Sequence, residues 1–238
     1  MRETGLLEVV ALHPADAEAA ESGGADRIQL VGSMEHGGLS CETATVSSVT
    51  RSTMLPVRVV LRLSEGFSTT GGELTRLVGL AGDYLGAGAD GVVFGFLNGQ
   101  LDVDVGVCQA IVDDLDGAPW TFHRAVDHSL DSDRAWRHLR QLPGLDAVLT
   151  AGSSLGVERG LEELSARAVA DPSVASLVMA GGGLEPAHVP WLVRAGVRAF
   201  HVGSSVRPQR SWSKAYVDPS FVRSWRLLID DHTTRMTS

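Results

Sequence analysis

One short pattern recurs along the chain: a glycine, two further residues, and then a run rich in Val, Leu and Ile. A glycine directly after a helix and just before a strand is typical of the loops that join helices to parallel strands. The recurrence therefore predicts a parallel sheet whose strands alternate with helices. The four junctions are Gly24-Ala25-Asp26 before residues 27–31, Gly88-Ala89-Asp90 before 91–97, Gly144-Leu145-Asp146 before 147–150, and Gly196-Val197-Arg198 before 199–202.

Four more apolar runs, at residues 6–11, 57–62, 119–123 and 177–180, bring the predicted strands to eight. Eight strand–helix units in about 200 residues are typical of a compact (β/α)8 barrel of the TIM type. We predict an α/β fold with this barrel as a single domain over residues 1–238, and an extra C-terminal helix that begins at Asp218-Pro219. A doubly wound open sheet is the alternative, because a sequence does not show whether a sheet closes.

Signals at helix starts and on helix faces agree with this layout. Pro14 and Pro186 suit the first turn of a helix, Thr70 and Glu73 have the spacing of a capping box, and Asp131 or Ser132 is expected to cap a later helix. Apolar residues also recur every three or four positions, which predicts helix faces packed on the barrel. These faces are Leu74, Leu77, Val78, Ala81 and Leu85; Ala135, Trp136, Leu139 and Leu142; and Val222, Trp225, Leu228 and Ile229.

Composition limits the partners. The net charge of -9 argues against nucleic acid or an anionic membrane as the main partner, although a few arginines can still hold a small anionic ligand. The two cysteines, Cys41 and Cys108, form no CxxC pair. The first apolar run, residues 6–12, contains Glu8 and is too short for a membrane span or a signal peptide, so we expect a cytoplasmic protein.

The segment from Thr121 to Asp127 places a histidine, an arginine and a carboxylate at the end of a predicted strand. Barrel enzymes keep their chemistry at the carboxyl ends of the strands. We therefore predict His123 as a general acid or base, with Asp127 or Glu8 as its partner or orienting group. The alternative is a closed layer of ion pairs, Glu8 with Arg62 and His123 with Asp127, that seals the barrel without a ligand.

Other polar residues fall late in predicted strands, and the last two strands end in turns that are rich in glycine. Arginines can clamp a carboxylate or phosphate, and exposed amides in glycine-rich loops bind oxyanions. Neither cysteine falls at a predicted strand end, so acyl transfer through a thiol nucleophile is not expected. The predicted ligand-binding residues are Arg62, Arg124, Thr150 and His201, with the amides of Gly182, Gly183, Gly203 and Ser204.

These residues resemble the copper homeostasis protein family CutC over roughly residues 7–205. The resemblance implies a TIM-type barrel, self-association into a homo-oligomer, and a cytoplasmic role in copper handling with copper ion binding. The most specific motif is Thr-Phe-His-Arg-Ala-x-Asp at residues 121–127. The others include Gly24-Ala25-Asp26-Arg27, Gly37-Gly38-Leu39, Asn98-Gly99-Gln100-Leu101-Asp102, Leu149-Thr150-Ala151-Gly152 and Met179-Ala180-Gly181-Gly182-Gly183.

The chain departs from the family pattern where copper would be held. Val10 and Val31 stand where relatives often have cysteine, and Gln29 and His36 replace glutamates. Because Cu(I) prefers soft sulfur ligands, we expect weak copper affinity, with any remaining site formed by histidine, methionine or cysteine. The candidates are Cys41, His36, Met34 and Met54. Three classes therefore compete: a copper-handling protein, an enzyme for a small anionic metabolite, and a barrel that works as a scaffold.

Overall fold

A computed structural model describes residues 5–34 and 37–237 and contains a closed barrel of parallel strands. Each strand pairs with the next, and β1 pairs with β8 to close the ring. The predicted barrel is therefore confirmed, and the open doubly wound alternative is wrong. The strands are β1 (Leu6–Ala11), β2 (Arg27–Leu30), β3 (Val57–Val60), β4 (Gly91–Phe94), β5 (Trp120–Phe122), β6 (Leu145–Thr150), β7 (Val178–Ala180) and β8 (Ala199–Val202).

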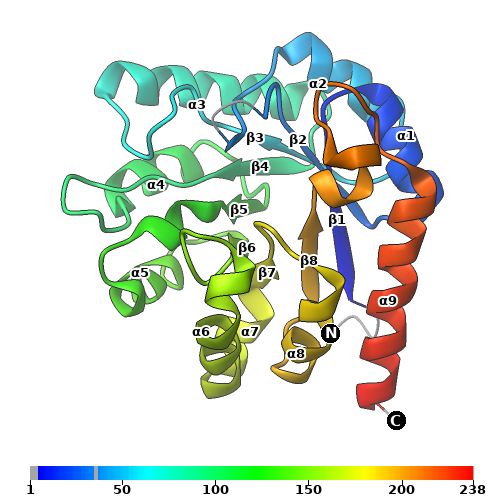
Figure 1. The fold of residues 1–238 in the computed structure, drawn as a ribbon. Coiled ribbons are helices and arrows are strands. Elements are labelled where there is room, and N and C mark those ends of the chain that lie inside the picture. The colour runs from blue at the N-terminus through cyan, green and yellow to red at the C-terminus, as the bar shows by residue number, and fades with distance from the viewer. Residues whose placement is uncertain (1–4, 35–36, 238) are drawn as a thin grey trace.

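Helices surround the barrel (Figure 1). They are α1 (Pro14–Gly23), α2 (Thr43–Thr50), α3 (Gly71–Gly86), α4 (Val105–Val112), α5 (Ser132–Leu139), α6 (Val157–Ala170), α7 (Pro172–Leu177), α8 (Val189–Arg194) and α9 (Pro219–Thr237). In the described residues, short 3-10 helices lie in the loops after strands: η2 (Arg124–His128), η3 (Pro186–His188), η4 (Ser204–Val206) and η5 (Pro208–Arg210). The helix predicted to begin at Pro186 starts as η3 and continues as α8.

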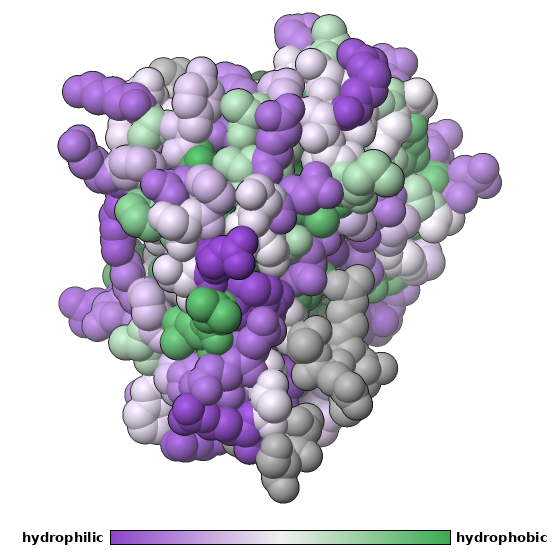
Figure 2. Space-filling view, turned by 90° about the vertical axis from the view of Figure 1, so that its right-hand side faces the viewer, coloured by the Kyte–Doolittle hydropathy of each residue, from purple (hydrophilic) through white to green (hydrophobic). Residues whose placement is uncertain are grey.

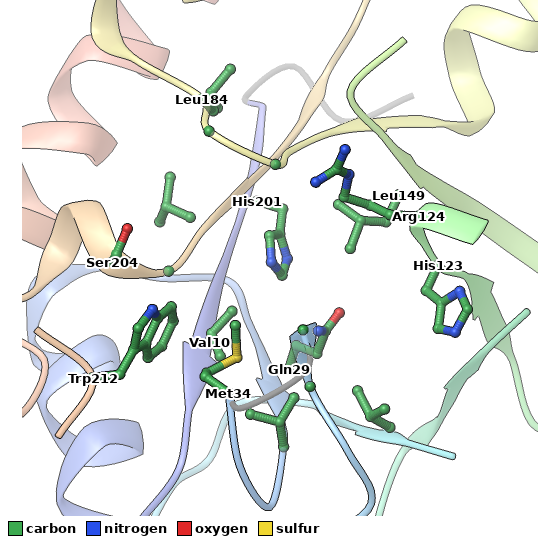
Figure 3. A pocket seen from close by; sticks show the side chains of 18 of the residues that line it. Val10, Gln29, Met34, His123, Arg124, Leu149, Leu184, His201, Ser204 and Trp212 are labelled. Carbon is green, nitrogen blue, oxygen red and sulfur yellow. The ribbon is translucent and has the colours of Figure 1, made fainter. Parts of the chain in front are cut away.

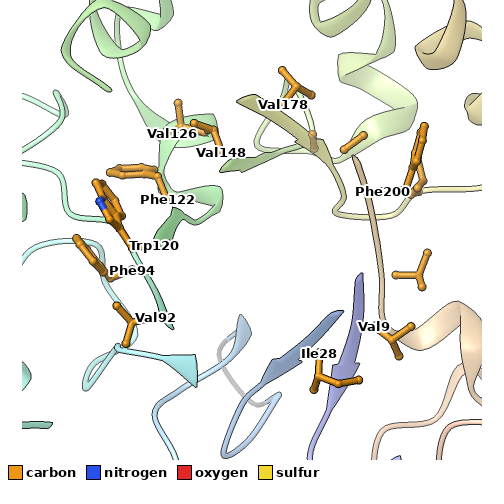
Figure 4. Close-up of a cluster of buried hydrophobic side chains, with 14 of the residues drawn as sticks. Val9, Ile28, Val92, Phe94, Trp120, Phe122, Val126, Val148, Val178 and Phe200 are labelled. Carbon is orange, nitrogen blue, oxygen red and sulfur yellow. The ribbon is translucent and has the colours of Figure 1, made fainter. Parts of the chain in front are cut away.

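Alternation along the strands separates two buried layers. In β1, Leu7, Val9 and Ala11 belong to the large core between the strands and the helices, whereas Glu8 and Val10 point into the barrel. Figure 4 shows part of the outer layer, where Phe94 and Trp120 stack with ring centroids 4.3 Å apart. Because this layer takes every second residue, the others face one another inside the barrel and at its mouth.

Several strands end earlier than the sequence predicts. β3 ends at Val60 and β5 at Phe122, so Arg62 and His123 lie in the loops just beyond their strands. The backbone turns away there to make other bonds: the amide of Arg62 donates to the hydroxyl of Ser40 over 2.9 Å. Both side chains thus start from the carboxyl rim of the barrel.

The predicted caps and helix faces are confirmed. Thr70 and Glu73 form the capping box of α3, and Asp131 caps α5 by accepting from the amide of Arg134 over 2.9 Å. In α9, Val222, Trp225 and Ile229 are buried, and the helix runs beside α1 and α8 (Figure 1). Polar side chains predominate on the face of the molecule that Figure 2 shows, on the side of α9. The apolar stripe of α9 is therefore turned inward.

Candidate functional site

A cavity of about 480 Å³ opens at the carboxyl ends of the strands. It is bounded by the loops after β2, β3, β5, β7 and β8, and the labelled residues of Figure 3 surround it. Eight of the predicted site residues line it: Arg62, His123, Arg124, Gly182, Gly183, His201, Gly203 and Ser204. The structure therefore brings these eight together, and their roles stay predictions. Glu8, Asp127 and Thr150 do not line the cavity among its described wall residues.

Glu8 is fully buried inside the barrel, below the cavity, and binds partners that the sequence did not suggest. Arg27 Nε donates to one carboxylate oxygen over 2.6 Å, and His201 Nδ1 lies 2.7 Å from the other. Burial alone would raise the pKa of Glu8, but Arg27 and His201 outweigh it and lower the pKa from 4.5 to about 2. Glu8 is therefore ionised and can only accept hydrogen bonds, and the alternative ion pair of Glu8 with Arg62 is wrong.

His201 gains a fixed orientation from this contact. Since the Glu8 carboxylate can only accept, His201 Nδ1 must carry the hydrogen that joins the two groups. The other ring nitrogen, Nε2, is then left as the acceptor of the neutral ring. His201 also lines the cavity, so its ring connects the buried carboxylate with the space where a ligand would bind.

Asp127 orients Arg124 rather than His123, so the predicted pair of Asp127 with His123 is wrong. Arg124 Nε donates to Asp127 Oδ2 over 2.8 Å. Thr150 donates its hydroxyl hydrogen to Asp127 Oδ1 over 2.5 Å. Thr150 turns away from the cavity because its neighbour Leu149 faces it, and successive strand residues alternate. Asp127 and Thr150 therefore support the wall from behind.

Arg124 lies against the backbone of Gly182. A Cβ atom at Gly182 would approach Arg124 Cζ to 2.6 Å, and the backbone φ there is +90°, which glycine adopts readily. The guanidinium also donates to the carbonyls of Ser153 and Ser154, at 3.0 and 3.3 Å. Gly182 therefore permits the position in which Arg124 reaches the cavity.

His123 is a neutral hydrogen-bonding group in this structure. Its Nδ1 accepts from the amide of Ala125 over 3.2 Å, so Nε2 carries the hydrogen of the neutral ring. Nε2 is buried and has no partner within the described chain. Burial, followed by the charge of Arg62, lowers the pKa of His123 from 6.5 to about 3. The His123 ring is therefore neutral near neutral pH and can donate from Nε2, and its role as a general acid or base stays a prediction.

Arg62 binds two loops at the rim. Its guanidinium donates to the carbonyls of Gly38 and Gly66, at 3.3 and 3.4 Å, and to that of Glu65. It also lies 5.0 Å from the centroid of the Phe67 ring. Burial lowers the pKa of Arg62. Arg62 thus joins the loop after β2 to the loop after β3 and adds positive charge to the wall of the cavity.

The loops after β7 and β8 expose backbone amides beside the cavity. The N–H groups of Gly182, Gly183, Ser204 and Ser205 are among those that find no acceptor in the part of the chain that the structure describes. Gly203, the other predicted amide donor, lines the same wall. Unpaired amides in these two loops of a barrel are suited to an oxyanion.

Sequence reasoning missed several cavity residues. Trp212, Glu185 and His128 line the cavity, and they lie in or beside irregular turns where no periodic pattern points to them. Arg210 lines the rim and forms a bidentate ion pair with Glu185, at 2.6 and 2.8 Å. Arg207, a nearby cation, is buried and forms an ion pair with Asp16, with Nη2 to Oδ2 at 2.6 Å.

The residues present do not fit a thiolate copper site. Val10 and Val31, the two strand-end positions at which the resemblance led us to look for thiolates, line the cavity and carry no sulfur. Burial raises the pKa of the Cys41 thiol to about 11 and that of the Cys108 thiol to about 12, so both are protonated near neutral pH. Within residues 5–34 and 37–237, no three His, Cys, Asp or Glu side chains group closely enough to hold a metal ion. His36, an expected ligand, lies outside the described residues.

The other expected copper donors are dispersed. Met34 lines the cavity, whereas Met54 is 91% exposed in the loop before β3. Among the described helices, none combines the length and the apolar character that crossing a membrane requires.

Comparison with known proteins identifies the family. The model of the CutC family matches residues 6–206. A CutC family protein of Xylella fastidiosa is 33% identical over 215 residues, which cover 89% of this chain and 80% of the relative. One of Klebsiella pneumoniae is 32% identical over 197 residues, which cover 82% of this chain and 78% of the relative. The solved CutC structure from Streptococcus agalactiae superimposes with a TM-score of 0.74 at 21% identity, and covers 84% of this chain and 98% of the solved chain. The chain therefore belongs to the CutC family.

Proposed function

We propose that this chain binds a small anionic metabolite at the barrel mouth, through a phosphate or carboxylate group, and acts on it by proton transfer. The observation that carries the proposal is the set of unpaired amides after β7 and β8, which border the same cavity as Arg62 and Arg124. The chain as a whole carries a net charge of -9, so these local arginines supply the attraction that the rest of the molecule lacks.

His201 suits the proton-transferring role better than His123. Its Nε2 is the acceptor of the neutral ring, and an imidazolium formed there would lie beside the ionised carboxylate of Glu8, 2.7 Å from Nδ1. A buried carboxylate that orients a histidine and stabilises its protonated form is a recurring arrangement in acid–base catalysis. In this role Nε2 takes a proton from the bound ligand and later returns it to the ligand or to water. His123 then contributes a neutral donor.

Phosphate titration of paired glycine variants tests the anion site. Ligands that bind only the folded state raise its melting temperature, so phosphate and sulfate should stabilise the parent protein. Gly182→Ala should weaken phosphate binding at least about tenfold, because the new Cβ displaces the Arg124 guanidinium. Gly117→Ala is the matched control: φ is also positive, at +80°, no atom lies within 4 Å of the added Cβ, and Gly117 does not line the cavity.

The variant Arg124→Gln should weaken phosphate binding as Gly182→Ala does, since both remove the cation from its position. Arg140→Gln is its control, because Arg140 lies on the surface and pairs with Asp171, over 2.8 Å. Isothermal titration calorimetry gives the affinities, and thermal melts show that each variant is folded. The proposal would be contradicted if phosphate and sulfate neither raised the melting temperature of the parent protein nor gave a heat of binding in the titration.

Copper handling is the function that the family implies, since the solved relative from Streptococcus agalactiae is named a copper homeostasis protein. Support for it in this chain comes from family membership alone, because the described residues do not fit a thiolate site. The anion site is therefore the function that the geometry supports best. Self-association and a cytoplasmic location stay predictions, and size-exclusion chromatography with light scattering would test the first.

A further inference from the structure

The cavity has a polar end and an apolar end. In Figure 3, Arg124 and His123 lie on one side of the space and Trp212, Met34 and Val10 on the other, with His201 and Gln29 between them. The cavity of about 480 Å³ falls within the range of sites for small organic ligands, which is roughly 300 to 1,000 Å³. A bare phosphate or small carboxylate would occupy only the polar end and leave the apolar wall against water.

Trp212 is held rigidly at the apolar end. A Cβ atom at Gly203 would approach the Trp212 ring to 2.6 Å, so the absence of a side chain lets the indole lie against the backbone. The guanidinium of Arg207 lies 4.8 Å from the ring centroid. Arg207 is itself fixed, because it is 1% exposed and donates twice to Asp16, at 3.1 and 2.6 Å. A half-buried aromatic ring that is already ordered can bind a ligand ring at little entropic cost.

Gln29 gives an independent indication of what the ligand carries. Its side chain is 7% exposed, lines the cavity, and has an amide oxygen that is buried without a hydrogen-bond partner in the described chain. A buried acceptor without a partner costs free energy. A hydroxyl or amino group on the middle of a bound ligand would satisfy it.

Together these contacts define a ligand, and the inference rests on the anion site proposed above. We propose that the metabolite is an aromatic or heteroaromatic ring that bears a phosphate or carboxylate and a hydroxyl or amino group. The anionic group lies at Arg124 and the amides of Gly182 and Gly183 after β7. The ring packs on Trp212, and its polar substituent bonds to Gln29.

Affinity ratios test the ring separately from the anion. Phenyl phosphate and methyl phosphate have the same charged group, so their ratio of dissociation constants isolates the ring. We expect phenyl phosphate to bind about tenfold more tightly to the parent protein, as an ordered aromatic contact with its buried area predicts. Trp212→Leu should bring the ratio close to one, and Trp212→Phe should restore most of it. Trp191→Leu, at an exposed tryptophan of α8, should leave the ratio unchanged.

A second ratio tests Gln29. 3-Aminophenyl phosphate, whose amino group lies on the side of the ring, should bind more tightly than phenyl phosphate to the parent protein, and Gln29→Leu should abolish this gain. Calorimetric titrations measure every pair, and circular dichroism confirms that the variants are folded. Equal binding of phenyl and methyl phosphate by the parent protein would contradict the proposal that the ligand carries an aromatic ring. It would leave the proposed anion site unaffected. If neither phosphate binds, both the ring and the anion site are wrong.

Discussion

Glu8 Oε1 lies 2.7 Å from His201 Nδ1, although 193 positions separate the two residues in the sequence. The contact follows from the closure of the barrel, because β1 pairs with β8 and places Glu8 directly opposite His201. Arg27 stands opposite Glu8 on the other side, in β2. The carboxylate is thus shared between a buried arginine and a histidine that reaches the cavity, which couples the stability of the barrel to the geometry of its mouth.

Replacing the carboxylate should be costly at neutral pH. Glu8→Gln leaves the buried charge of Arg27 without its closest carboxylate, and breaking a buried pair in this way costs about 3 to 5 kcal/mol. Urea denaturation at pH 7 measures the free energy of unfolding. Glu18→Gln, at an exposed glutamate of α1, is the control and should change it by no more than about 0.5 kcal/mol. Equal stability of Glu8→Gln and the control would contradict a stabilising role for the pair.

The difference in the free energy of unfolding between the parent protein and Glu8→Gln should depend on pH in the acid range. Because the pKa of Glu8 is lowered from 4.5 to about 2 on folding, the unfolded chain binds a proton in this range before the folded protein does. The stability that the ionised carboxylate provides is complete above pH 4.5 and is lost as the pH falls toward 2. The gap between the parent protein and Glu8→Gln should therefore narrow over this window by on the order of 3 kcal/mol. A constant gap would mean that Glu8 titrates normally in the folded protein.

His123 should make the parent protein sensitive to a different pH range. The folded protein keeps His123 neutral with a pKa of about 3, whereas the unfolded chain protonates it below its usual 6.5. The stability that the neutral ring of His123 provides is therefore complete above pH 6.5. It is lost as the pH drops toward 3, by up to about 1.4 kcal/mol per pH unit. His123→Asn does not titrate, and its side chain can still accept at the start of η2. In urea denaturation between pH 7.5 and 5, the free energy of unfolding should fall more steeply for the parent protein than for His123→Asn. Parallel pH dependences of the two proteins would contradict this expectation.

The sequence predicted which positions reach the barrel mouth but not how their side chains pair. Alternation and the glycine junctions are local patterns, and they located the strand ends that carry Arg62, His123 and His201. Partners depend on the register between strands that are distant in the chain. Glu8 pairs with Arg27 and His201 because they stand opposite it, whereas Arg62 lies beyond the end of β3.

Two misses have specific physical causes. Thr150 was expected to bind a ligand, but Leu149 faces the cavity and places Thr150 on the other side of β6. The register between β5 and β6 also shifts at Trp120 and Thr121, an irregularity without a sequence signal. Trp212 follows a 3-10 turn in which Gln209 and Arg210 have positive φ, at 54° and 56°, and such turns have no periodicity to recognise.

The C-terminal helix should contribute to stability through one face only. Ile229 is fully buried against the barrel, whereas Leu227, two positions earlier on α9, is 63% exposed. Ile229→Ala removes buried methyl groups and should lower the free energy of unfolding by about 2 to 5 kcal/mol. Leu227→Ala makes a comparable chemical change at the surface and should cost no more than about 0.5 kcal/mol. Urea denaturation measures both, and similar values for the two variants would mean that α9 does not pack as part of the barrel.

Copper should bind weakly to this chain. The cavity presents Val10 and Val31 at the strand ends, and burial keeps the Cys41 thiol protonated by raising its pKa to about 11. A thiol must lose its proton before it can bind Cu(I). At neutral pH the free energy of deprotonating Cys41 therefore reduces its affinity for Cu(I). A competition titration of the reduced protein against a strong Cu(I) chelator should leave the copper on the chelator. The double variant Val10→Cys/Val31→Cys, which places two thiols in the wall of the cavity, should retain more copper than the parent protein in the same titration. Stoichiometric retention of copper by the parent protein would show that donors other than these thiolates form the site.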